Sequence, residues 1–164
     1  MIQIDQVNLG ILQHHLTQKN NMYEYRAKVN RIIDGDSVVL DIDLGFDTWL
    51  NNQSIRLFGI DTPECRTKDL DEKARGLLAK SRVEELLPIG DVVFIKTIKD
   101  KNEKFGRILG ELINDEEINI NATLLEENLA APYFGQSKKQ VEEAHLENRE
   151  ILIEQGKFKP INED

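Results

Sequence analysis

Two acidic residues occupy positions where turns can aim their carboxylates into open space. Asp36 follows a glycine in an Asp-Gly-Asp turn, and Asp61 comes directly before a Thr-Pro pair. Two carboxylates at neighbouring strand ends could hold one hard cation, because calcium prefers oxygen ligands. Each residue could instead be an ordinary turn aspartate, which bonds through its side chain to the nearby backbone.

One glutamate and two arginines could complete a site for phosphate chemistry. Glu64 lies three residues after Asp61, where it could act as general base for an attacking water or remain a solvated loop residue. Arg56 interrupts an apolar segment, and Arg107 opens another. Two guanidinium groups could clamp a phosphate and stabilise the charge that grows on its oxygens. For Arg56 the alternatives are a structural ion pair or a strand edge that leaves its tip in water.

A basic segment stands out in an acidic chain. It contains Lys96, Lys99, Lys101, Lys104 and Arg107. Such a segment could steer a phosphate chain, or it could be a solvated hairpin loop.

These residues need strands to position them, and the sequence pattern predicts five. The predicted strands are 23–33, 37–46, 54–60, 92–98 and 107–113. Helices are predicted from residue 70 to Pro88, over 122–129, and from residue 141 to a stop at Gly156. This order matches an OB-type barrel, which is an α+β, mainly β fold of five strands and about three helices.

Side-chain alternation predicts which residues face the barrel interior. Val38, Leu40, Ile42 and Leu44 should share one buried face, with aspartates on the other. The aromatic residues Tyr23, Tyr25, Phe46 and Trp49 are expected to pack in the barrel or its hairpins rather than stack on bases.

Length and composition suit one globular domain with a hydrophobic core. The chain has 164 residues, of which 40% are hydrophobic, and no apolar run approaches the roughly 20 residues that cross a bilayer. Residues 1–21 are interpreted as a tail or accessory helix, 22–156 as the domain, and 157–164 as a tail. The first residues do not resemble a secretory leader and Cys65 is the only cysteine, so a cytoplasmic location is expected.

Four segments resemble the staphylococcal nuclease (thermonuclease) family. Three are its signature strings, IIDGDSV (32–38), RLFGIDTPE (56–64) and KFGRILGEL (104–112). A fourth, INATLLEENLAAPY (120–133), is similar to the family's helix and the segment after it. The resemblance covers roughly residues 24–155.

This resemblance implies an OB-fold barrel, one calcium ion per site, and cleavage of DNA and RNA that leaves 3′-phosphate ends. The implied metal ligands are the carboxylates of Asp36 and Asp61 and the backbone carbonyl of Thr62. The implied catalytic residues are Arg56, Glu64 as general base, and Arg107. The implied substrate contacts are Lys104 to phosphate, Leu109 in the base pocket, and Tyr133.

The sequence also departs from the family pattern. Phe105 replaces a tyrosine and so removes one hydroxyl contact to phosphate, and Ser37 replaces a threonine after the first metal aspartate. The loop 65–72 is shorter and more acidic than the lysine-rich loop of the family.

Two other kinds of function compete with the enzyme. A catalytically silent OB-type module that binds nucleic acid or protein should lack one or more of the acidic and arginine residues above, and it should be more basic than this chain, whose net charge is −9. A structural domain that interacts through the tail before Asn21 is the second alternative. The expected substrate is DNA, RNA or both, with no membrane and no obligate protein partner.

Overall fold

The computed structural model describes residues 23–98 and 107–161 of the 164-residue chain. The predicted tail at 1–21 and the predicted phosphate contact Lys104 therefore lie outside the described residues, together with most of the basic segment.

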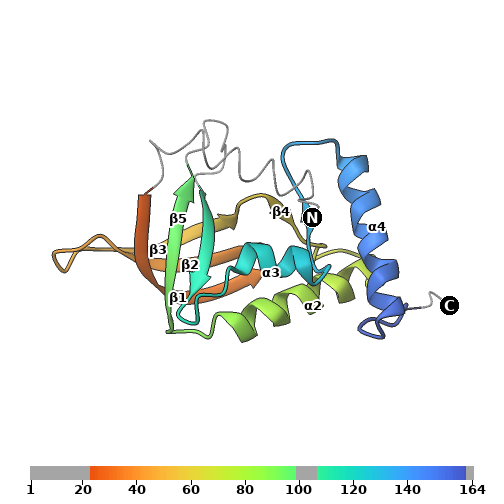
Figure 1. Cartoon of the computed structure of the whole chain (residues 1–164), viewed down its shortest axis with the longest axis horizontal. Helices are drawn as coiled ribbons and strands as arrows, with labels where there is room; N and C mark the ends of the chain where they lie inside the picture. The colour runs from red at the N-terminus through yellow and green to blue at the C-terminus, as the bar shows by residue number, and fades with distance from the viewer. Residues whose placement is uncertain (1–22, 99–106, 162–164) are drawn as a thin grey trace, which may run out of the picture.

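Five described strands close into a barrel. Around its circumference they are β1 (Tyr23–Asp34), β2 (Ser37–Asp43), β3 (Trp49–Leu57), β6 (Ile108–Asn114) and β5 (Val92–Ile98) (Figure 1). β3 and β6 run parallel, and the other neighbouring pairs are antiparallel. The predicted five-stranded barrel is confirmed.

Three helices accompany the barrel in the described part of the chain. They are α2 (Leu70–Leu86), α3 (Ile120–Glu126) and α4 (Lys138–Glu154). The side chain of Asp69 caps the start of α2, and Ser137 with Gln140 forms a capping box at the start of α4. Among these helices, none is long and apolar enough to cross a membrane. The α+β, mainly β class is confirmed.

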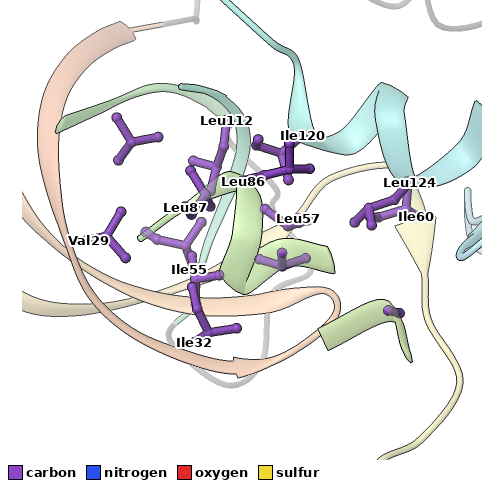
Figure 2. Close-up of a cluster of buried hydrophobic side chains, with 14 of the residues drawn as sticks. Val29, Ile32, Ile55, Leu57, Ile60, Leu86, Leu87, Leu112, Ile120 and Leu124 are labelled. Carbon is purple, nitrogen blue, oxygen red and sulfur yellow. The ribbon is translucent and has the colours of Figure 1, made fainter. Parts of the chain in front are cut away.

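The core fills the barrel and continues under the three described helices. Figure 2 shows Ile55 and Leu57 of β3 gathered with Leu112 of β6 and with Leu86 and Leu87 at the end of α2. These five side chains are all at most 8% exposed. Each contributes about 1.5–3 kcal/mol by leaving water, so the core holds the strands whose ends carry the candidate site.

The hairpin between β2 and β3 corrects two predictions about packing. Val38, Leu40 and Ile42 are buried as predicted, but β2 ends at Asp43 and Leu44 is exposed. The next residues turn in the left-handed region, at Gly45, Phe46 and Asp47, so the chain leaves the barrel there. The hairpin projects from the barrel at the left of Figure 1.

The aromatic side chains follow the same correction. Phe46 is fully exposed at the hairpin tip, and Tyr23 and Trp49 are exposed as well. The prediction that these residues pack in the barrel or its hairpins is therefore wrong for Phe46, while Tyr23 and Trp49 keep much of their surface in solvent. Tyr25 is partly buried against the core and stacks on Tyr23, with ring centroids 6.4 Å apart.

A second, small sheet joins distant parts of the chain. β4 (Ile60–Asp61) pairs antiparallel with β7 (Ala131–Pro132), so Asp61 lies opposite Ala131. The predicted single strand 54–60 is thus broken by a turn at Phe58 and Gly59, and β4 leads the chain away from the barrel. This pairing brings the segment before α4 to the end of β4.

The packed structure continues beyond the end of α4. Gly156 ends the helix with a positive φ of 68°, as the sequence predicts. Phe158 then turns back and is buried in the core, and its N–H bonds to the carbonyl of Leu152.

Candidate active site

Asp36 and Asp61 converge on one guanidinium group. Arg56 forms an ion pair with Oδ2 of Asp36 through Nη1, and with Oδ1 of Asp61 through Nη2 at 3.1 Å. The two nitrogens belong to one planar group, so the two carboxylates lie within reach of a single positive charge. The arginine side chain is only 14% exposed, which protects this arrangement from solvent.

Strand register explains why these residues meet. Ser37 is the register partner of Arg56 in the β2–β3 ladder, and the N–H of Leu57 bonds to the carbonyl of Asp36 at 2.8 Å. Asp36, one residue before β2, therefore lies beside Arg56. Asp61 lies five residues further along the same chain segment, after the turn that separates β3 from β4.

Local hydrogen bonds fix the Asp36 carboxylate. The backbone N–H of Thr62 donates to its Oδ2 at 2.9 Å, and the hydroxyl of Ser37 donates to its Oδ1 at 3.0 Å. Asp36 and Thr62 are both buried. A buried carboxylate needs such donors, because leaving it unpaired costs several kcal/mol.

Two glycines let α2 approach the acidic turn and the loop after Asp61. A Cβ at Gly35 would lie 2.8 Å from the side chain of Thr62 and 2.9 Å from that of Ala79 on α2. A Cβ at Gly76 of α2 would lie 2.6 Å from the carbonyl oxygen of Pro63 and 2.8 Å from the carbonyl carbon of Glu64. Helix, turn and loop are in close contact, so α2 supports the site from behind.

Replacing Gly76 by alanine is expected to lower both stability and activity. Alanine favours a helix over glycine by about 0.5–1 kcal/mol, but the new Cβ would overlap backbone atoms, and such overpacking costs about 1–3 kcal/mol. The backbone of Pro63 and Glu64 must shift to relieve the overlap. Thermal melting and a cleavage assay would measure both effects, with the exposed neighbour Leu77→Ala as control. A Gly76→Ala protein that is more stable and fully active would contradict this packing.

Asp34 is a third acid at the site that the sequence analysis did not single out. Its Oδ1 accepts the N–H of Asp36 at 3.3 Å. Burial raises the pKa of the Asp34 carboxyl to about 6, with further contributions from the charge of Asp36 and a side-chain hydrogen bond to it. The Asp-Gly-Asp spacing was the available signal, because it puts two acids on either side of one turn.

Asparagine at position 34 is expected to stabilise the metal-free protein at neutral pH. The folded-state pKa lies above the ordinary value of 3.8, so Asp34 progressively lowers the free energy of unfolding as pH rises from about 3.8 to about 6. Below the ordinary pKa of 3.8, Asp34 is neutral in both the folded and the unfolded protein, so the stability that Asp34→Asn gains over wild type should vanish. After allowance for solvent screening it is about 1–2 kcal/mol at pH 7. Melting in chelator from pH 4 to pH 8 would measure it, with the exposed Asp47→Asn as control. Equal pH dependence in Asp34→Asn and wild-type protein would count against it.

His145 also contacts the site, although no spacing in the sequence indicated a role for it. Its Nε2 lies 2.8 Å from Oδ2 of Asp61, the oxygen that Arg56 does not contact. The two residues are 84 positions apart, and no sequence spacing connects a helix face to a short strand so far away. The pairing of β4 with β7 and the contacts of α4 with α2 bring His145 to this place.

The other two predicted catalytic residues, Glu64 and Arg107, lie on segments that adjoin this cluster in sequence or register. Glu64 is exposed in the loop before α2, three residues after Asp61. Leu109 is the register partner of Arg56 across the parallel β3–β6 pair, so both occupy the same face of the sheet. Arg107 lies two residues before Leu109, at the entry to β6, and is partly buried.

Tyr133 follows β7 and lies beside the strand that carries Asp61. Its N–H bonds to the carbonyl of Gly59 at 2.9 Å, and its side chain is exposed. The next residue, Phe134, packs edge-on against Phe58 with ring centroids 6.3 Å apart. The backbone of Tyr133 thus lies beside the turn that precedes Asp61, whereas Lys104 falls outside the described residues.

The donor set of the acidic cluster fits a hard cation. Among the described residues, no group of three or more His, Cys, Asp or Glu side chains is arranged to hold a metal ion. Asp36 and Asp61 nevertheless converge on one positive group, and the backbone carbonyl of Thr62 belongs to the adjoining residue. Oxygen donors of this kind suit calcium, which completes its shell with water.

The fold and this cluster together define a class of protein. It is a small OB-type barrel whose strand ends carry paired carboxylates and an arginine, which suits a cation and a phosphate. Residues 54–156 match the family described as staphylococcal nuclease homologue. The chain belongs to this family.

Curated relatives are similar over most of this chain. Endonuclease YhcR of Bacillus subtilis (strain 168) is 29% identical over 132 residues, which are 77% of this chain and 10% of that protein. SPbeta prophage-derived endonuclease YokF of the same organism is 28% identical over 137 residues, 78% of this chain and 44% of that protein. Thermonuclease of Staphylococcus hyicus is 29% identical over 115 residues, 70% of this chain and 63% of that protein. The chain spans less than two thirds of each.

Proposed function

We propose that this chain is a calcium-dependent nuclease that hydrolyses phosphodiester bonds of DNA, RNA or both. The observation that carries the proposal is the convergence of Asp36 and Asp61 on Arg56. It occurs in a chain that belongs to the staphylococcal nuclease homologue family and whose relatives are named endonuclease or thermonuclease.

The carboxylates of Asp36 and Asp61 and the carbonyl of Thr62 are the proposed cation ligands. When bound there, calcium supplies positive charge against the negative charge that grows on the phosphoryl oxygens. Hydrogen bonds hold the Asp36 carboxylate in position, because it accepts bonds from the N–H of Thr62 and the hydroxyl of Ser37.

Arg56 and Arg107 are proposed to bind the same phosphate. Arg56 is already oriented by two ion pairs, so little reorganisation is needed when charge develops near it. Arg107 lies at the entry to β6, the strand parallel to the one that carries Arg56. Arginine suits this task better than lysine, because its planar fork donates two parallel bonds to a phosphate.

Glu64 is proposed to accept a proton from the attacking water. Its exposed position in the loop after Asp61 leaves it open to solvent, as a general base for water requires. Attack on phosphorus breaks the bond to the 5′-oxygen, which takes up a proton. The products are then a 3′-phosphate end and a 5′-hydroxyl end.

Residues around this cluster are proposed to hold the rest of the substrate. Leu109 lies across from Arg56 and offers an apolar surface to a base, and Tyr133 borders the same region from β7. Lys104 remains a proposal from the sequence alone. Phe105 cannot donate the hydroxyl bond to phosphate that a tyrosine would make there, so weaker substrate affinity is expected.

The ends of the products test this chemistry directly. Single-stranded DNA, plasmid DNA and RNA would each be digested with calcium and the fragments labelled by a polynucleotide kinase. We expect labelling at 5′-hydroxyl ends without prior phosphatase treatment. Fragments that accept label only after phosphatase treatment, or intact substrate throughout, would contradict the proposed reaction.

A further inference from the structure

We propose that His145 of α4 is a positioning residue that holds the Asp61 carboxylate in place for the cation. The inference rests on the proposed function, because it assigns a role toward the same site. Its basis is the contact of 2.8 Å between Nε2 of His145 and Oδ2 of Asp61.

Asp61 needs this support more than Asp36 does. It lies on β4, which has only two residues and pairs only with β7 in the described structure. Its side chain is 30% exposed, whereas that of Asp36 is 10% exposed. Asp36 also accepts bonds from two groups close to it, the N–H of Thr62 and the hydroxyl of Ser37.

Two side chains restrain the Asp61 carboxylate, one at each oxygen. Arg56 contacts Oδ1 at 3.1 Å, and His145 contacts Oδ2 at 2.8 Å. Together they fix the plane of the carboxylate. Each oxygen can accept more than one bond, so lone pairs remain for a cation.

His145 can restrain Asp61 because α4 is itself anchored on two sides. Arg149, one turn further along, bonds to both oxygens of Asp71 on α2 at 3.0 and 3.2 Å. Asn148 donates to the carbonyl of Ala130, next to β7, at 3.0 Å. The side chain of His145 is only 13% exposed.

The anchoring network reaches His145 itself. Arg75 of α2 donates to the carbonyl of His145 at 3.4 Å, and it also bonds to Asp71 at 3.1 Å. Burial alone would raise the pKa of Asp71, but the hydrogen bonds from Arg149 and Arg75 outweigh it and lower the pKa. The carboxylate therefore stays ionised and keeps its hold on both arginines near neutral pH.

An imidazole with a proton on Nε2 donates a hydrogen bond to the Asp61 carboxylate. A side chain that hydrogen-bonds to a metal-ligating carboxylate orients it, and losing such a side chain costs about 10- to 100-fold in metal affinity. A histidine that merely docked α4 would change the melting temperature and leave cation affinity alone.

Two amide substitutions distinguish a role of His145 in positioning Asp61 from a role in docking α4. His145→Gln keeps an N–H donor at about the reach of Nε2, whereas His145→Asn carries the same amide on a shorter side chain. His145→Leu removes the donor and keeps bulk. Leu146→Gln, at the exposed neighbouring position, is the matched control.

Calorimetry would measure calcium binding without substrate. Cleavage assays with calcium would give kcat and KM, and thermal melting would be followed in chelator. We expect calcium binding about 10- to 100-fold weaker in the Leu and Asn variants, with the Gln variant and the control close to wild type. We also expect the calcium concentration for half-maximal cleavage to follow the same order at saturating substrate.

Three results would overturn the inference. Wild-type calcium affinity in His145→Leu or His145→Asn would show that His145 does not position Asp61, and would leave the proposed function standing. Binding as weak in His145→Gln as in His145→Asn, at equal melting temperature, would show that the donor at Nε2 is not what matters. Wild-type protein that binds no calcium would overturn the proposed function, and the positioning role with it.

Discussion

Arg56→Ala protein is expected to lose both activity and stability. Removal of one preorganised charge at a phosphoryl site costs about 100-fold or more in rate. The substitution also leaves Asp36 and Asp61 without the guanidinium group that they share. Breaking a buried ion pair costs about 3–5 kcal/mol, and the partial exposure of Asp61 reduces this to about 2–3 kcal/mol.

Cleavage rates with calcium and urea denaturation in chelator would measure the two losses. Arg56→Lys should recover part of the stability but little of the activity, because an ammonium cannot bridge two carboxylates as a planar fork does. Arg82→Ala is the control for activity, since Arg82 makes its ion pairs with Glu85 and Glu127 outside the site. A fully active Arg56→Ala protein would remove the arginine from the proposed reaction.

Glu64→Gln protein is expected to stay folded and lose most of its activity. A positioned general base contributes about 100- to 10,000-fold to a rate, and glutamine cannot accept the proton of the attacking water. Glu64 is exposed, so its loss should change the free energy of unfolding by less than about 0.5 kcal/mol, a range typical of surface substitutions. The melting temperature should then stay within about 2 °C of wild type.

A lower cleavage rate with unchanged calcium affinity would distinguish a general base from a cation ligand. Single-turnover cleavage should fall while calcium binding, measured by calorimetry, stays near wild type. Glu84→Gln, an exposed glutamate on α2, is the matched control. Retained cleavage in Glu64→Gln protein would assign the water-activating role to another group.

Much of this architecture could be predicted because its signals are local. The alternation of Val38, Leu40 and Ile42 indicated a strand, and the acidic turn before it indicated a hairpin. Once β2 and β3 pair, register alone places Asp36 beside Arg56. The structure brings the two carboxylates and the arginine together, which fits both the catalytic hypothesis and the alternative of a structural ion pair for Arg56, and their roles in catalysis stay predictions.

Other features could not be predicted because they depend on contacts between distant segments. His145 meets Asp61 partly because two residues of β4 pair with two residues of β7, and strands so short leave no alternation to detect. Gly76 lies in the interior of a helix, where the sequence does not reveal that a backbone passes within 2.6 Å of a missing Cβ.

The prediction for the projecting hairpin failed for a related reason. Alternation continues through Leu44, but a pattern of apolar residues does not say where a strand leaves the sheet. The left-handed backbone at Phe46 and Asp47 takes the chain out of the barrel, although neither is a glycine. Non-glycine residues seldom adopt this conformation, so the sequence favoured the wrong packing.

Cleavage of DNA with and without calcium tests the central claim most directly. Plasmid and single-stranded DNA would be incubated with the protein in calcium, in magnesium, or in excess chelator. We expect degradation that calcium supports and that chelation abolishes. Full degradation in chelator would contradict the proposed function, because cleavage would then proceed without a cation at Asp36 and Asp61.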